Sequence, residues 1–150
     1  MKIRFASLAM LLVLGVMGSA TQMSAQQQVR LRARTNKTVL GVETELRGDY
    51  RERGGPIRLN SELENINMPA GTPVAFCLLK DGVKSLLGVG HVVISGGRPF
   101  ASVELEANDG DTVPSVDAGN VLEAHQRLTK PFNPKPTCGS VLIISAPFQK

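Results

Sequence analysis

Aromatic side chains are scarce in this sequence, which has no Trp, one Tyr and five Phe in 150 residues. Carbohydrate-binding β-sandwiches usually present exposed aromatic rings that stack on sugars. Only Tyr50 and Phe132 are candidates for such a ring. The scarcity therefore argues against glycan binding by stacking.

The sequence also has none of the motifs that mark common catalytic sites. It contains no G-x-S-x-G elbow, no P-loop and no H-E-x-x-H, and Gly88-Val89-Gly90 lacks the third glycine of a dinucleotide fingerprint. His91, one of two histidines, alternates with apolar neighbours, which predicts a histidine packed within a strand. His125 is predicted to be exposed on a polar face. We therefore expect no catalytic residue and no cofactor.

Metal-binding patterns are equally weak. Asp109, Asp111 and Asp117 lie in glycine-containing loops, but their spacing lacks the alternating ligands and the terminal glutamate of an EF-hand. Ordinary turn chemistry accounts for aspartates in such loops without an ion. We therefore predict no metal site.

One long apolar run occurs, close to the first residue of the sequence. Lys2 and Arg4 lead into an apolar run at residues 6–16, and small residues follow up to Ala20 and again up to Ala25. This pattern is typical of a secretory signal peptide, with cleavage after Ala25 favoured and cleavage after Ala20 as the alternative. The run is short for a membrane span, so an uncleaved anchor is the less favoured interpretation.

The predicted division is a signal peptide at residues 1–25 and one domain at residues 26–150, secreted or periplasmic and not membrane-spanning. The whole chain has 17 Lys and Arg against 13 Asp and Glu, a net charge of +4. The net charge falls to +2 in the mature domain, because two of the basic residues belong to the signal peptide. So small a surplus gives no reason to expect nucleic acid as a partner.

Cysteine is rare as well, with Cys77 and Cys138 as the only two. In an oxidising compartment an even pair predicts one disulfide. Two free buried thiols are the alternative, and metal ligation by two isolated cysteines without a C-x-x-C is less favoured than either.

Residues 71–107 predict three consecutive antiparallel strands joined by glycine turns. The first, at residues 74–79, is apolar on both faces, which is typical of a strand covered on each side. Asp81-Gly82 suits a type I′ hairpin turn. Gly88 and Gly90 interrupt the second strand and predict a bend or a close backbone approach. The third strand alternates with polar residues, so we place the first two inside the sheet and the third nearer an edge.

Further strand patterns flank this region. Residues 29–34, 42–53 and 57–64 alternate between apolar and polar side chains, and residues 141–144 form a short apolar run. Residues 121–128 contain good helix formers, but their position between glycine-marked turns favours a strand. We expect an all-β fold, a single antiparallel β-sandwich or flattened barrel of about seven or eight strands.

Arg30, Arg32 and Arg34 project from one face of the first predicted strand. One interpretation is cross-strand pairing with acidic residues of neighbouring strands. The acidic residues at hand for such pairing are Glu43, Glu45 and Glu62. The other interpretation is a docking patch for an anionic partner such as a cell-surface polymer. Pairing is the favoured interpretation, because the acidic residues are available to answer the charge.

Several short motifs punctuate residues 50–121. They are Y-R-E-R-G-G from Tyr50, L-E-N-I-N-M-P-A-G-T from Leu63, the Lys80-Asp81-Gly82 turn, and D-G-D-T-V-P from Asp109 leading to Ala118-Gly119-Asn120-Val121. In these motifs the chain resembles a loosely defined group of small secreted bacterial β-sandwich proteins of unknown function. The resemblance implies a small antiparallel β-sandwich and carries no activity and no functional residues.

The expected function is a non-catalytic binding module that uses loops or an exposed strand edge to bind a protein or a surface polymer. A structural subunit or assembly adaptor of the cell envelope is the alternative. A small hydrolase or metal-dependent enzyme that uses one of the histidines with nearby carboxylates ranks last.

Overall fold

The computed structural model describes residues 29–52, 56–127, 137–139 and 141–150. Within these ranges the chain forms nine strands and one short 3-10 helix. Their bounds are β1 Val29–Val39, β2 Val42–Glu52, β3 Arg58–Glu64, β4 Pro73–Lys80, β5 Val83–His91, β6 Val93–Ser95, β7 Arg98–Glu106, η1 Ala107–Asp109, β8 Val121–Gln126 and β9 Val141–Gln149. The signal peptide predicted at residues 1–25 lies outside the described residues. None of the described helices is long and apolar enough to cross a membrane.

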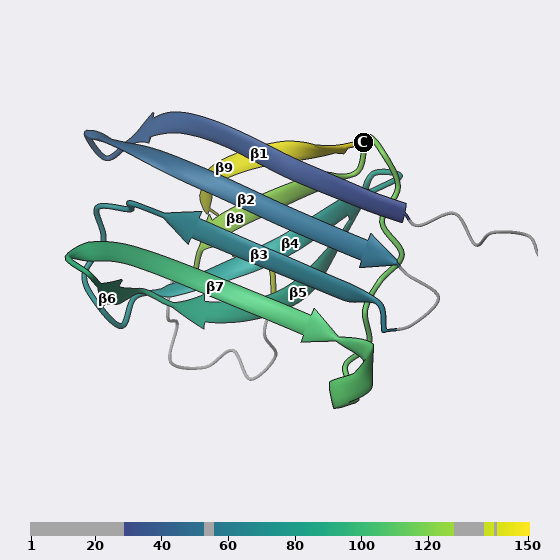
Figure 1. Cartoon of the computed structure of the whole chain (residues 1–150). Helices are drawn as coiled ribbons and strands as arrows, with labels where there is room; N and C mark the ends of the chain where they lie inside the picture. Colours follow the sequence, from purple (N-terminus) through teal and green to yellow (C-terminus); the bar gives the residue numbers. More distant parts are fainter. Residues whose placement is uncertain (1–28, 53–55, 128–136, 140) are drawn as a thin grey trace, which may run out of the picture.

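The strands form one antiparallel sheet that closes almost completely into a barrel (Figure 1). Their order is β5-β4-β8-β9-β1-β2-β3-β7-β6. β5 and β6 stand at opposite ends of this order, yet Val92 alone separates them in the chain. The predicted all-β fold is confirmed. The described part of the chain has nine strands because the single strand expected across residues 83–94 is divided at Val92 between two partners, β4 and β7.

Two glycines bring β5 against β7 and so close the barrel. A Cβ placed on Gly90 would lie 2.6 Å from the carbonyl oxygen of Ser102, and one on Gly88 would lie 2.7 Å from Cγ1 of Val103. The predicted close approach is therefore confirmed, and the β4–β5 register shifts beside Gly88, between Phe76 and Cys77. The expectation that this second strand lies inside the sheet is wrong, because β5 ends the strand order and its first three residues are exposed.

Apolar side chains fill the interior of the barrel. The largest fully buried ones are Tyr50, Phe76, Phe148, Leu46, Leu59, Leu63, Ile66, Leu78 and Leu122. Burial of each such side chain contributes about 1.5–3 kcal/mol relative to leaving it exposed. Tyr50 is 1% exposed and so presents no ring to a sugar. Phe132, the other candidate for stacking, lies outside the described residues.

β4 and β8 are neighbours in the sheet and are buried on both faces. All residues from Val74 to Leu78 are buried, as the apolar pattern predicts. The ambiguous segment at residues 121–128 is a strand where it is described, at Val121–Gln126. Asp81 and Gly82 both have positive φ, which confirms the hairpin turn after β4.

The predicted disulfide joins Cys77 on β4 to Cys138, with a Cα–Cα distance of 6.0 Å across a sequence separation of 61 residues. In the chain-entropy model, closure of a loop of this size stabilises the fold by about 4 kcal/mol. Such a bond is typical of an oxidising, extracytoplasmic environment.

Candidate functional site

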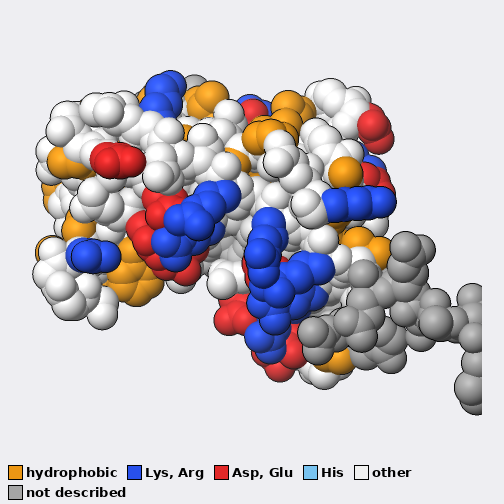
Figure 2. Space-filling model, turned by 45° about the horizontal axis from the view of Figure 1, so that its top comes forward, with side chains coloured by type: hydrophobic (Ala, Val, Ile, Leu, Met, Phe, Trp, Pro, Cys, Tyr) orange, Lys and Arg blue, Asp and Glu red, His pale blue; other side chains and the backbone are white. Residues whose placement is uncertain are grey.

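Five arginines share the outer face of β1 and β2, and we call them the arginine face. Arg30, Arg32 and Arg34 stand on β1, and Arg47 and Arg51 stand on β2. The register of the hairpin places Arg30 opposite Arg51 and Arg34 opposite Arg47. Like charges directly opposite each other destabilise a sheet unless a counter-charge answers them. Figure 2 shows Lys and Arg side chains gathered on this side of the molecule with acidic side chains beside them.

Asp49 is the counter-charge at the centre of the arginine face. Arg30 Nη2 and Arg51 Nη2 both donate to its Oδ2, at 2.7 Å and 2.8 Å. Partial burial by itself raises the pKa of Asp49, but the hydrogen bonds from Arg51 and Arg30 outweigh it and lower the pKa from 3.8 to about 2. Asp49 is therefore ionised at neutral pH and holds two guanidinium groups in place.

Glu45 is the counter-charge between the second pair of opposed arginines, Arg34 and Arg47. Arg34 Nε lies 2.5 Å from its Oε1 and Arg47 Nε lies 2.8 Å from the same oxygen. The hydrogen bond from Arg47 is the main reason that the pKa of Glu45 is lowered. Arg47 also pairs with Glu64 at 2.9 Å. The predicted pairing of a β1 arginine with Glu45 is thus present.

Arg32 differs from the other members of the arginine face. It lies opposite Asp49 in the register, but it forms no ion pair with any described residue. Arg34 also remains 67% exposed despite its pair with Glu45. Among the described residues three carboxylates therefore pair with four of the five arginines, and Arg32 keeps its charge toward solvent.

A shallow groove of about 440 Å³ runs across the arginine face beside Arg32. Its lining residues are Arg32, Ala33, Arg34, Arg47, Gly48, Asp49, Asn60 and Glu62. We call it the central groove. β1 supplies one wall with Arg32 and Arg34, and β3 supplies the other with Asn60 and Glu62. The groove therefore has a cationic wall on β1 and a wall on β3 that carries one amide and one carboxylate.

A second groove of about 640 Å³ adjoins the first and is acidic. Its lining residues are Asn36, Glu43, Glu45, Glu62, Glu64, Asn65, Ser95, Arg98, Pro99 and Phe100. Partial burial, and then the neighbouring Glu64 carboxylate, raise the pKa of Glu62. Glu43 and Glu62, the other two predicted partners of the β1 arginines, form no ion pair within the described ranges.

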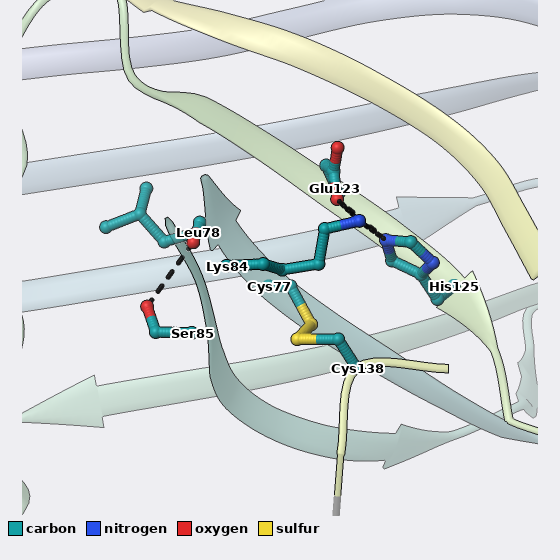
Figure 3. Close-up of a disulfide and its surroundings, with 7 residues drawn as sticks. All are labelled: Cys77, Leu78, Lys84, Ser85, Glu123, His125 and Cys138. Atoms are coloured by element: carbon teal, nitrogen blue, oxygen red, sulfur yellow. Dashed lines mark hydrogen bonds and ion pairs between the residues drawn. A yellow bond between two sulfur atoms is a disulfide. The ribbon is translucent and has the colours of Figure 1, made fainter. Parts of the chain in front are cut away.

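A buried polar cluster lies on the opposite side of the barrel, beside the disulfide (Figure 3). Glu123 Oε2 accepts from Lys84 Nζ at 2.7 Å and from His125 Nε2 at 2.8 Å. Burial by itself raises the pKa of Glu123, but the hydrogen bonds from Lys84 and His125 outweigh it and lower the pKa. His125 is 2% exposed, and its Nδ1 has no hydrogen-bond partner among the described residues. The imidazole and the carboxylate are therefore enclosed, while the Lys84 side chain remains 39% exposed.

The predictions for the two histidines are wrong. His125 is buried, because β8 lies between β4 and β9 and its outer face is covered by Lys84 and by the chain at Gly139, which lies against Gln126. His91 is exposed at the end of β5, because Gly90 and Val92 take the inward-facing positions on either side of it.

The loop aspartates hold the backbone and a neighbouring strand. Asp111 Oδ2 accepts from the backbone N–H of Glu106 at 3.1 Å, and Asp117 pairs with Lys80 at 2.5 Å. The described residues contain no group of three or more His, Cys, Asp or Glu side chains placed to hold a metal ion.

Sequence patterns alone missed two parts of these sites. Arg47 and Arg51 share a face of the second predicted strand, but only the register brings them beside the β1 arginines. Glu123 and His125 share a face of β8, but Lys84 comes from β5, so no local pattern signals its contact with them.

Comparison of the chain with family models, with characterised proteins and with solved structures found no match.

Proposed function

We propose that this protein is a secreted or periplasmic, non-catalytic binding module that holds an anionic surface polymer on its arginine face. The observation that supports the proposal is the placement of Arg32, an exposed arginine without a described ion-pair partner, on the wall of an open groove. The neighbouring guanidinium groups are already oriented by Asp49 and Glu45. Their order reduces the entropy that a ligand would otherwise have to overcome.

The spacing of the arginines favours a polymer over a small ion. Arg30, Arg32 and Arg34 alternate along one strand face, so successive guanidinium groups stand about 7 Å apart. A guanidinium group binds carboxylate, sulfate or phosphate through two parallel hydrogen bonds. A chain with repeated anionic groups engages several arginines at once, and each added contact raises the effective concentration for the next.

Dextran sulfate is a suitable probe, with uncharged dextran as the control ligand. Binding is measured by isothermal titration at two salt concentrations. We expect the wild type to bind dextran sulfate and not dextran, with an affinity that falls as salt rises, because exposed charges are screened.

The double variant R32Q/R34Q is expected to bind dextran sulfate about tenfold more weakly, which corresponds to about 1.4 kcal/mol. Lys37→Gln is the matched control, because Lys37 is an exposed cation of β1 outside the arginine face. It is expected to bind like the wild type. Equal binding of dextran and dextran sulfate, or equal affinity of wild type and R32Q/R34Q, would contradict the proposal.

A further inference from the structure

Arg32 and Glu62 are opposite charges on opposite walls of the central groove. Neither forms an ion pair among the described residues. In the register, Arg32 on β1 lies opposite Asp49 on β2, and Asp49 lies opposite Asn60 on β3. Glu62 is the next residue of β3 on the same face after Asn60, so it lies two strands away from Arg32 and two residues further along. That separation is about 10 Å across the strands, because neighbouring strands are about 4.8 Å apart. The two charges are thus available to a partner that brings the complementary charges at the same spacing.

A second copy of this chain is such a partner. We propose that two copies pair face to face across the central groove, about a two-fold axis that lies over β2, so that Arg32 of each copy meets Glu62 of the other. A two-fold contact is self-complementary, because each surface patch meets the same patch of its mate with the roles of its halves exchanged. The charge pair is therefore formed twice, and the assembly closes at two copies.

A second pair of charges fits the same axis. Arg51 aligns with Arg58 on β3 and Asp49 aligns with Asn60, whose partner on β7 is Glu104. Glu104 thus lies two strands away from Arg51 and one row further along, the same step that leads from Arg32 to Glu62. Within one copy Arg51 pairs with Asp49 at 2.8 Å and Glu104 pairs with Arg58 at 3.4 Å. A rotation that exchanges the first pair brings Arg51 of one copy toward Glu104 of the other, which adds a contact to these existing pairs.

Charge complementarity of exposed side chains makes a contact that depends on salt. We expect the dimer at low ionic strength and the monomer at high ionic strength. Arg32 also belongs to the proposed polymer site, so an anionic polymer and a second copy compete for it. The dimer does not require the polymer, and the two proposals can fail separately.

Sedimentation velocity of the mature protein tests the inference. At about 100 µM protein the wild type is expected to sediment as a dimer in about 20 mM salt and as a monomer in about 500 mM salt. Circular dichroism and thermal unfolding of every variant check that the fold is retained.

Charge reversal identifies the contact. Arg32→Glu alone and Glu62→Arg alone are each expected to give monomers, because each places like charges in apposition twice. An equal mixture of these two variants is expected to form heterodimers, and the double variant R32E/E62R to form homodimers, because opposite charges then meet again. The neutral variants R32Q and E62Q are expected to weaken the dimer without this rescue.

Three results would overturn the inference. They are a wild type that stays monomeric at low salt, a dimer that survives both single reversals, and a mixture of the reversed variants that stays monomeric although both variants are folded. Loss of the dimer together with intact binding of dextran sulfate would remove this inference and leave the proposed function standing.

Discussion

Gly90 on β5 and Ser102 on β7 lie in backbone contact at the point where the barrel closes. A Cβ on Gly90 would meet the carbonyl oxygen of Ser102 at 2.6 Å and its backbone nitrogen at 3.1 Å. These atoms belong to the main chain, which is held in the β7 ladder to β3. The absence of a side chain at Gly90 is therefore a condition for closing the sheet.

Gly90→Ala is expected to lower the free energy of unfolding by about 3 kcal/mol, because the added methyl group forces two strands apart. Chemical denaturation monitored by circular dichroism measures the loss. Gly88→Ala is the comparison, because its added Cβ meets the side chain of Val103 and not a backbone. The combination G88A/V103A is expected to lose less than the sum of its two single changes. An unaltered denaturation midpoint for Gly90→Ala would show that the two strands separate freely.

Reduction of the bond between Cys77 and Cys138 is expected to lower the free energy of unfolding by about 4 kcal/mol, because the open loop restores chain entropy to the unfolded state. The measurement compares denaturation of the oxidised protein with that of the reduced and alkylated protein. The variant C77A/C138A, in which reductant has nothing to cleave, is the control. If reductant left the wild-type midpoint in place, the bond would not constrain the unfolded chain.

Protonation of Asp49 at acid pH is expected to lower the free energy of unfolding. Its pKa is lowered from 3.8 to about 2 in the folded protein, so its contribution is complete above pH 4 and is lost as the pH falls toward 2. At pH 7, Asp49→Asn is expected to cost about 1 kcal/mol, because the two ion pairs are partly exposed. The gap between wild type and variant, measured by denaturation across pH 2–7, is expected to narrow below pH 4. If the difference in unfolding free energy between wild type and Asp49→Asn stayed constant across this pH range, the charge of Asp49 would not be the source of the stabilisation.

Glu123→Gln is expected to lower the free energy of unfolding by about 2–3 kcal/mol at neutral pH, because Lys84 and the buried His125 lose their shared anion. The pKa of Glu123 is lowered in the folded state, so its contribution is present above its ordinary pKa and is lost as the pH falls through the folded value. Urea denaturation at several pH values measures both effects. Asp117→Asn breaks an exposed pair with Lys80 and is expected to cost less than about 1 kcal/mol. Equal losses for the two variants would argue against a special role for the buried cluster.

Strand positions were predictable from local patterns. The doubly apolar run at residues 74–79 became the buried β4, and Asp81-Gly82 became a turn with two positive φ angles. Even the ambiguous β8 was predictable from its place between turns. These features depend on neighbours in the chain, since alternation of side chains and the freedom of glycine act over a few residues.

The exposure of individual side chains was less predictable. His91 and His125 were both assigned to the wrong environment, because burial depends on which strands lie beside a residue and on what covers the outer face. The arginine face poses the same difficulty. The alternation in each strand shows that its charges share a side, but the pairing of Asp49 with Arg30 required the register between two strands.

The sequence by itself determined the all-β architecture, the turns and the pair of cysteines available for a disulfide, because each of these follows from residue type and local spacing. Only the tertiary structure decided that one strand divides at Val92 to link the two ends of the sheet. It also decided which arginines pair with a carboxylate and that Arg32 has no such partner in the part of the chain that the structure describes. The physical reason is that closure and charge pairing are set by distances between residues far apart in the chain, which local periodicity does not encode.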